Sequence, residues 1–229
     1  MKAATVVSGR AAGTAGNARH LPLAKPVAEI PTGKLVTLRR KAKTCRACPL
    51  WRNATQTVFG EGPASAKAML IGEQPGLQED QSGKPFVGPA GHLLDRALDE
   101  AGLDRDTLYL TNTVKHFKYE MRGNTKLHKR ANASEQAACR MWLAAELLRV
   151  QPRVVIGLGA MAAQTLFGDA FRITRERGQW RELGEEVRGM ATWHPSAVLR
   201  MPKPDQRHQA YAELVADLRD VVAVLADMA

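Results

Sequence analysis

The sequence contains no run of 18 or more apolar residues, so we expect no membrane-spanning helix. Cysteine is scarce, because three residues in a chain of 229 do not make a disulfide framework and an odd count argues against complete pairing. We therefore expect a reducing compartment, the bacterial cytoplasm. The Gly- and Pro-rich stretch at 71–94 lacks the P-loop and Gly-x-Gly-x-x-Gly spacings, which argues against a site for a nucleoside triphosphate or a dinucleotide there.

Acidic residues are nearly absent from the first 52 positions, where eleven Lys and Arg face Glu29 alone. This excess equals the formal net charge of +10, because the remaining 22 basic and 22 acidic residues cancel. Residues 115–130 hold a second excess, with six basic residues against Glu120. Two basic regions favour a polyanionic partner, although a solvated tail and a solvated loop would have the same composition.

Residues 1–33 are rich in Ala, Gly, Arg and Pro and show no hydrophobic periodicity, which predicts a disordered basic tail. An organelle transit peptide has a similar composition, but no amphipathic helix emerges here, so we favour a bacterial-type tail. The chain is 45% apolar, enough to bury one substantial core. We expect residues 34–229 to form a single domain, and the protein to be a monomer.

Short apolar runs alternate with helical patterns along this domain. The predicted strands are residues 68–71, 108–114, 154–158 and 190–193. The predicted helices are residues 89–101, 134–150, 159–167 and 205–226. The alternation predicts a three-layer α/β/α fold with a central, mostly parallel, four-stranded sheet. Residues 168–188 look irregular or hairpin-like, and residues 115–130 look like a basic loop.

Polar side chains follow three of the predicted strands at their carboxyl ends, where open parallel sheets bind ligands. Glu73 and Gln74 follow the first strand, Asn112 ends the second, and His194 and Ser196 follow the fourth. Loop residues with satisfied hydrogen bonds could look the same, but convergence from three strands favours a site. The first strand also leads through a Gly- and Pro-rich loop into a helix start, where backbone N–H groups can approach a bound group.

Cys45 and Cys48 are spaced so that both sulfurs can reach one metal centre. The same pair could be a redox couple or two small apolar residues.

Six sequence blocks between Cys45 and the C-terminus occur in the order seen in iron–sulfur uracil-DNA glycosylases. They are the Cys45/Cys48 pair, Gly-Glu-Gln-Pro-Gly at 72–76, Lys-Pro-Phe-Val-Gly-Pro-Ala-Gly at 84–91, Thr-Asn-Thr-Val-Lys-His-Phe-Lys at 111–118, Ala-Cys-Arg-Met-Trp at 138–142, and His-Pro-Ser at 194–196. The Val-Lys-His-Phe-Lys segment and the long basic loop ending in His128 resemble most closely the X branch of that family, UdgX.

The resemblance implies a 4Fe–4S cluster ligated by Cys45, Cys48, His116 and Cys139, where relatives outside the X branch have a cysteine in place of His116. Three thiolates and an imidazole also suit a structural zinc ion, and the spacing does not choose between them. His116 could instead face DNA or be an ordinary loop histidine. Because hydrolysis needs no redox step, we expect a structural role for the cluster.

The resemblance also implies roles for Phe86 and for the polar residues at the carboxyl ends of the strands. Phe86 would stack on an extruded uracil, and Asn112 would bond to its O4 and N3–H edge, which cytosine does not match. His194 would donate to uracil O2 as negative charge builds on the departing base, and Gln74 would supply backbone contacts. Core packing of Phe86 and a strand-end cap at Asn112 are the alternatives.

Two routes to the sugar are open. In a water-using glycosylase, Glu73 would position or deprotonate the nucleophile. In UdgX-like proteins, a histidine on the basic loop attacks C1′ and stays bonded to the DNA, and His128 occupies that place. The branch usually has Lys-Arg-Arg-Ile-His, whereas this chain has Asn-Thr-Lys-Leu-His at 124–128, so capture could give way to water attack. A third possibility is an iron–sulfur protein that binds nucleic acid without cleaving it.

Five residues are expected to contact the DNA backbone. They are Lys115, Lys126, Lys129, Arg130 and Ser196. The expected substrate is uracil-containing DNA, including single-stranded DNA.

Overall fold

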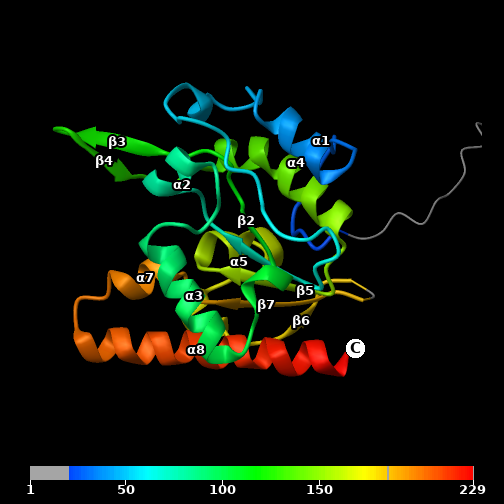
Figure 1. Ribbon diagram of the computed structural model, residues 1–229, viewed down its shortest axis with the longest axis vertical. Coiled ribbons are helices and arrows are strands. Elements are labelled where there is room, and N and C mark those ends of the chain that lie inside the picture. Colours follow the sequence, from blue (N-terminus) through cyan, green and yellow to red (C-terminus); the bar gives the residue numbers. More distant parts are fainter. Residues whose placement is uncertain (1–20, 185, 229) are drawn as a thin grey trace, which may run out of the picture.

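The computed structural model describes residues 21–184 and 186–228, which form three layers around one sheet (Figure 1). The sheet has five strands in the order β2-β1-β5-β7-β6. Four strands are mutually parallel: β1 (Ala68–Gly72), β2 (Tyr109–Asn112), β5 (Val154–Leu158) and β7 (Arg188–Thr192). Their carboxyl ends therefore meet along one edge, as the sequence predicts.

Helices cover both faces of the sheet because alternate residues of each strand point in opposite directions. On one face, Leu70 and Ile156 pack in a cluster with residues of α3 (Pro89–Ala101) and α8 (Pro204–Asp227). On the other, Met69 and Val155 pack with α4 (Ala133–Val150) and α5 (Ala160–Phe167). All residues of β1 and β5 are buried, which explains their uninterrupted apolar sequences. The predicted three-layer α/β/α fold is confirmed.

Shorter elements complete the chain. They are α1 (Leu35–Ala42), η1 (Pro49–Arg52), α2 (Leu77–Ser82), η2 (Arg105–Thr107), α6 (Ile173–Glu176) and α7 (Pro195–Leu199). None of the helices in the described ranges is long and apolar enough to cross a membrane.

The structure adds strands that the sequence analysis did not count. A fifth strand, β6 (Arg181–Glu182), pairs antiparallel with β7 inside the stretch expected to be irregular or hairpin-like. The expected basic loop contains a second, two-stranded sheet of β3 (Tyr119–Arg122) and β4 (Thr125–His128). This hairpin projects from the body of the protein (Figure 1). Gly123 and Asn124 at its tip, between alternating polar and apolar residues, were the available signal.

The described part of the predicted tail packs on the domain. Leu21 and Leu23 contact the cluster beneath α4 and α5, and the Ala24 N–H donates to the Thr165 carbonyl at 3.0 Å. The Lys25 ammonium lies 2.6 Å from the Asp169 carboxylate. The prediction for residues 1–20 lies outside the described residues.

Lys115 is buried, so its predicted contact with the DNA backbone is wrong. Its Nζ donates to Glu146 Oε2 at 2.6 Å, to Thr111 Oγ1 at 2.7 Å and to the Asn112 carbonyl at 2.7 Å. Both side chains of the Lys115–Glu146 pair are 0% exposed. Glu146 also accepts from the Gly60 N–H at 2.8 Å, so the pair ties α4 to the end of β2. Lys115 therefore has a structural role inside the protein, although its sequence context is a basic loop.

Replacing Lys115 with methionine should lower the free energy of unfolding by about 3–5 kcal/mol, because Glu146 would be left as an unpaired buried carboxylate. The matched control is Lys25→Met, whose ion pair with Asp169 is exposed and whose loss should cost at most about 1 kcal/mol. Urea unfolding of both variants measures the difference. Equal losses in the two variants would contradict the structural role given to Lys115.

Candidate active site

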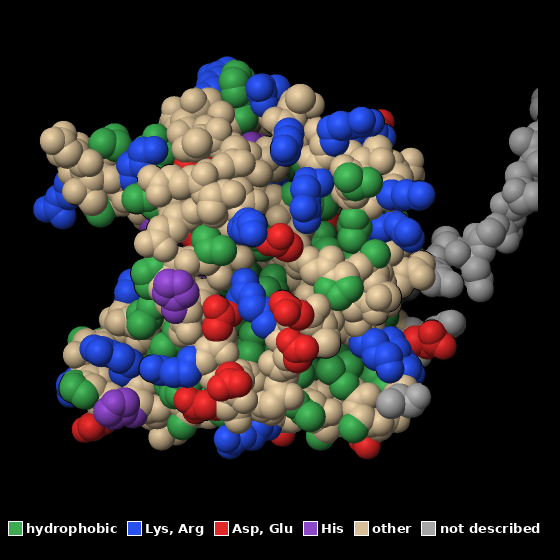
Figure 2. Space-filling view, viewed as in Figure 1, with side chains coloured by type: hydrophobic (Ala, Val, Ile, Leu, Met, Phe, Trp, Pro, Cys, Tyr) green, Lys and Arg blue, Asp and Glu red, His purple; other side chains and the backbone are tan. Residues whose placement is uncertain are grey.

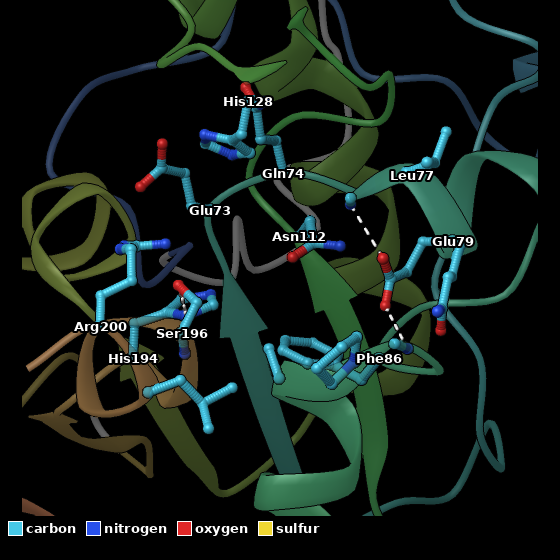
Figure 3. Close-up of a pocket in the computed structure, with 16 residues that line it drawn as sticks. Glu73, Gln74, Leu77, Glu79, Phe86, Asn112, His128, His194, Ser196 and Arg200 are labelled. Carbon is cyan, nitrogen blue, oxygen red and sulfur yellow. Dashed lines mark hydrogen bonds between the residues drawn. The ribbon is translucent and has the colours of Figure 1, made fainter. Parts of the chain in front are cut away.

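A pocket of about 380 Å³ opens at the carboxyl ends of β1, β2 and β7, below the base of the hairpin (Figure 3). Its size suits a small organic ligand. It is lined by Glu73, Gln74, Gly76, Leu77, Gln78, Glu79, Phe86, Gly88, Pro89, Ala90, Asn112, His128, His194, Ser196, Leu199 and Arg200. The predicted catalytic and base-binding residues are therefore together in one cavity.

The floor of the pocket depends on Gly72, the last residue of β1. A Cβ at this position would collide with Asn112 Oδ1 and would lie 2.6 Å from Phe86 Cζ. The side chains of Phe86 and Asn112 are both buried, at 5% and 3% exposure, and both occupy the space that a side chain at Gly72 would need. Within the described residues the Asn112 side chain makes no hydrogen bond, so its donor and acceptor remain available to a ligand.

Phe86 is held in an unusual backbone conformation, with φ at +55°. Such a conformation persists when its surroundings impose it. The Glu79 carboxylate accepts hydrogen bonds from the N–H groups of Val87 and Gly88 at 3.0 and 2.7 Å, and from that of Gly76 at 3.0 Å. Glu79 thus joins the two loops on either side of the pocket and fixes the Phe86 ring.

Sequence reasoning missed Glu79. The available signal was its place as the third residue of α2 after Gly76, where a carboxylate reaches back to the free N–H at a helix start. Its second role, on Val87 and Gly88, depends on a contact between segments that only the fold brings together.

His194 presents a hydrogen-bond donor to the pocket. Its Nδ1 accepts from the Ser196 N–H at 3.1 Å and lies 2.9 Å from the Ser196 hydroxyl, so the ring proton of the neutral form is on Nε2. Burial lowers the pKa of His194 to about 4, together with smaller contributions from the nearby Arg200 and His128. The ring lies 6.3 Å from that of Phe86, between centroids. His194 is therefore a neutral donor above pH 4.

His128, the last residue of β4, reaches the pocket from the hairpin and faces Glu73 (Figure 3). Burial lowers its pKa below the ordinary value of 6.5, the Glu73 carboxylate opposes that shift, and Arg200 adds to it. The imidazole is therefore mostly neutral at pH 7, with a lone pair on one ring nitrogen. A neutral imidazole beside a carboxylate is a suitable nucleophile or base.

Gln74 connects the hairpin to the sheet. Its side-chain amide donates to the carbonyls of Lys118 and Lys129 at 3.1 and 3.2 Å, which lie just before β3 and just after β4 at the base of the hairpin. Its Oε1 is buried and has no partner among the described residues. The side chain of Gln74 thus holds the protein's own hairpin next to His128, and the predicted backbone contacts of Gln74 to uracil stay a prediction.

The three cysteines lie in one corner, where α1, η1 and α4 meet. The Trp142 indole N–H donates to Cys45 Sγ at 3.3 Å, and the Lys115 backbone N–H donates to Cys139 Sγ at 3.2 Å. Such donors stabilise thiolate ligands of metal centres. In the described ranges no three Cys, His, Asp or Glu side chains lie close enough to hold one metal ion, so the ligand set stays a prediction.

His116 has the tautomer that a metal ligand needs. The Thr57 hydroxyl donates to the Ala42 carbonyl at 2.9 Å, so in its 2.9 Å contact with His116 Nε2 it accepts the ring proton. The lone pair is then on Nδ1. The histidine is 4% exposed, which disfavours the alternative of a DNA-facing residue.

The other three basic residues predicted to contact the DNA backbone have partners within the protein. Lys126 Nζ lies 4.4 Å from the centre of the Tyr119 ring, Lys129 pairs with Glu120, and Arg130 bonds to Gln164 at 3.3 Å. All three are at or near the surface around the hairpin, and their contacts with a DNA backbone stay predictions, as does that of Ser196.

Comparison with known proteins gives a consistent result. The sequence model of the uracil DNA glycosylase superfamily matches residues 59–219, which include every residue lining the pocket. The type-4 uracil-DNA glycosylase of Thermotoga maritima is 38% identical over 161 residues, 70% of this chain and 80% of the relative. Those of Pyrobaculum aerophilum and Archaeoglobus fulgidus are 35% and 33% identical, over 73% and 78% of this chain and 86% and 90% of their own.

The ring of His194 should titrate near pH 4 and should carry its neutral-state proton on Nε2, because Ser196 occupies Nδ1. Unfolding takes up a proton between pH 4 and the ordinary value of 6.5, so stability should fall as pH falls through this window. Ring-nitrogen NMR over pH 3.5–8 measures the tautomer and pKa. Titration near pH 6.5, or a proton on Nδ1, would contradict this geometry.

Proposed function

The chain belongs to the uracil-DNA glycosylase superfamily, and from this premise we propose that it excises uracil from DNA at the pocket described above. One observation carries the proposal: a stacking ring, an amide and an imidazole donor surround one small cavity, as a uracil-binding site requires. Extrusion of the nucleotide from the DNA would place its base against Phe86, with the O4 and N3–H edge at Asn112 and O2 toward His194.

Cleavage of the C1′–N1 bond sends its electron pair into uracil, and negative charge collects on O2. The Nε2–H donor of neutral His194 is in place before this charge develops, which is the arrangement that favours a transition state over the ground state. The sugar becomes positively charged at the same time, and Glu73 supplies a carboxylate on that side of the pocket. His194 thus stabilises the negative charge on uracil, and Glu73 stabilises the positive charge on the sugar.

The sugar is then captured by His128. A ring nitrogen gives its lone pair to C1′ as uracil leaves with the bonding pair, and the proton on the other nitrogen passes to Glu73 or to the uracil anion. The product is a neutral imidazole bonded to an otherwise abasic sugar, and no water is consumed. The neutral state of His128, its position in the pocket and its anchorage through Gln74 support this route.

The altered loop sequence fits the same route. Thr125 and Lys126 replace the arginines usual in the X branch, yet the hairpin is paired along both strands and clamped at its base. Water attack directed by Glu73, with His128 as a bystander, is the alternative. It would release abasic DNA and allow repeated turnover.

Incubation with uracil-containing single-stranded DNA should give a DNA band that stays shifted under denaturing conditions, at most one per protein molecule. In His128→Ser the shifted band should disappear while free uracil accumulates, because Glu73 can still direct water to the sugar. Glu73→Gln should slow both adduct formation by the wild-type chain and uracil release by His128→Ser by at least about a hundredfold, the lower range for a general base. Multiple turnovers by the wild type without a shifted band would favour the hydrolytic alternative.

We assign the cysteine corner to a 4Fe–4S cluster held by Cys45, Cys48, Cys139 and His116 Nδ1, with a structural zinc ion as the alternative. The N–H donors at two sulfurs and the tautomer of His116 fit such a centre. When bound, the centre would link the segment around α1 to α4 and β2. No step of the excision reaction passes through it.

Protein purified without oxygen should be brown, with iron and inorganic sulfide in equal amounts, and Cys139→Ser should lose both together with thermal stability. His116→Cys should keep the centre, whereas His116→Ala should weaken it. Iron, sulfide and zinc analysis of each variant measures the outcome. Stoichiometric zinc without sulfide in the wild type would favour the zinc alternative.

We further expect the protein to act as a monomer in the bacterial cytoplasm and to accept uracil in single-stranded DNA. The two basic regions of the sequence support a polyanionic partner, and the scarcity of cysteine supports a reducing compartment.

A further inference from the structure

The loop that carries Phe86 is held at its carbonyl groups as well as at its N–H groups. Arg105, the first residue of η2, donates from Nη2 to the carbonyls of Pro85 and Phe86, at 3.3 and 3.2 Å. These carbonyls belong to the two peptide groups that flank the Phe86 Cα, and the orientation of those planes sets φ and ψ of that residue. One guanidinium nitrogen thus fixes the backbone of Phe86 directly.

The other contacts of the loop do not replace this one. Glu79 bonds only to N–H groups that follow Phe86. Gly91 lets the first turn of α3 pack against the loop, because a Cβ there would lie 2.0 Å from the Phe86 carbonyl oxygen. Among the described residues no other group donates to the carbonyls of Pro85 and Phe86. The left-handed conformation of Phe86, with φ at +55°, therefore depends on Arg105.

Arg105 lies outside the pocket and is itself held in place. It is not one of the residues that line the cavity. Its Nη1 pairs with the Asp95 carboxylate of α3, and both side chains are partly exposed. Arg105 can therefore affect a base in the pocket only through the Phe86 loop.

A contact with a DNA phosphate is the alternative role for an arginine near this site. The surroundings of Arg105 argue against it, because Figure 2 shows acidic side chains gathered over α3. The acidic residues of α3, η2 and the turn between them are Asp95, Asp99, Glu100, Asp104 and Asp106. Negative charge of this density repels a phosphate backbone, so the internal contacts are favoured.

We propose that Arg105 is a positioning residue for uracil excision, which holds the two peptide groups beside Phe86 and so keeps the aromatic ring where the extruded base must stack. This inference rests on the proposed function, because stacking on Phe86 is part of it. Without the guanidinium, the loop should relax toward an ordinary backbone conformation and turn the ring away from the pocket. Fewer protein molecules would then offer a stacking platform to the base.

A double-mutant cycle tests whether Arg105 acts through Phe86. Arg105→Met, Phe86→Ala and the combined variant are compared with the wild type. The matched control is Arg96→Met, which removes a guanidinium that contacts Glu100 and Tyr211 instead of the loop. The first-turnover rate constant for uracil release is measured on a single-stranded oligonucleotide with one deoxyuridine, with protein in excess but below saturation. Binding of the same oligonucleotide with tetrahydrofuran, a sugar without a base, at that position measures the affinity for DNA alone.

Phe86→Ala should lower the rate constant by about five- to 150-fold, the range for stacking of a base on an aromatic side chain. Arg105→Met should lower it by about two- to tenfold, the lower part of the range for coupled neighbours, and should lower it no further once the Phe86 ring is absent. Arg96→Met should react as the wild type. All four variants should bind the tetrahydrofuran oligonucleotide as tightly as the wild type, which a general loss of folded protein would not allow.

Asp95→Ala repeats the test if Arg105→Met does not fold, because it frees the guanidinium without removing it. Its loss in rate constant should be smaller than that of Arg105→Met, and should likewise disappear in the Phe86→Ala background.

A wild-type rate constant for Arg105→Met would overturn the inference, and so would a loss that persists unchanged in the Phe86→Ala background. A loss accompanied by equally weakened binding of the tetrahydrofuran oligonucleotide would indicate a DNA contact of Arg105, and would also overturn it. Failure of the proposed function has a different signature. In that case the wild type would release no uracil, or Phe86→Ala would release it as fast as the wild type, and the inference would fall with it.

Discussion

The attachment of the hairpin to the sheet edge is the contact on which the reactive site depends. Gln74 is the second residue after β1, and its side-chain amide donates to a carbonyl on each side of the hairpin base. Two short antiparallel strands with mostly exposed side chains need such anchors, and the Tyr119 hydroxyl, which donates to the Asn53 carbonyl at 3.1 Å, adds another. The clamp brings a histidine of a separate two-stranded sheet opposite Glu73 of the main sheet, and so creates a site that neither sheet has alone.

The two imidazoles in the pocket have different tasks because their surroundings differ. Ser196 occupies Nδ1 of His194 and leaves a fixed N–H donor for the departing base. His128 has no such partner among the described residues, lies beside Glu73 and keeps a lone pair for the sugar. Arg200 lowers the pKa of both rings and thereby helps to keep both neutral. One cation thus supports two opposite roles, a donor and a nucleophile.

The sequence predicted those parts that local signals determine. The limits of α3 follow from Pro89 and Gly102, and β5 is a continuous apolar run, so both were located correctly. The convergence of the residues at the strand ends followed from the parallel topology, whereas the places of Phe86 and His128 in the pocket followed from the family resemblance. Lys115 was misplaced because a lysine in a basic loop gives no hint of a buried glutamate 31 residues later. Glu79 was missed since its contacts with Val87 and Gly88 depend on how the intervening loop folds. β6 lies in the stretch expected to be irregular or hairpin-like, and two residues are too few to show a strand pattern.

The central claim is that His128 becomes bonded to the sugar from which uracil has been cut. The direct measurement is the mass of the intact protein after reaction with a uracil-containing oligonucleotide, followed by fragmentation of the modified peptide. The account predicts an increase equal to the oligonucleotide minus uracil, located on His128. Unmodified protein accompanied by free uracil and abasic DNA, or a modification on any other residue, would contradict it.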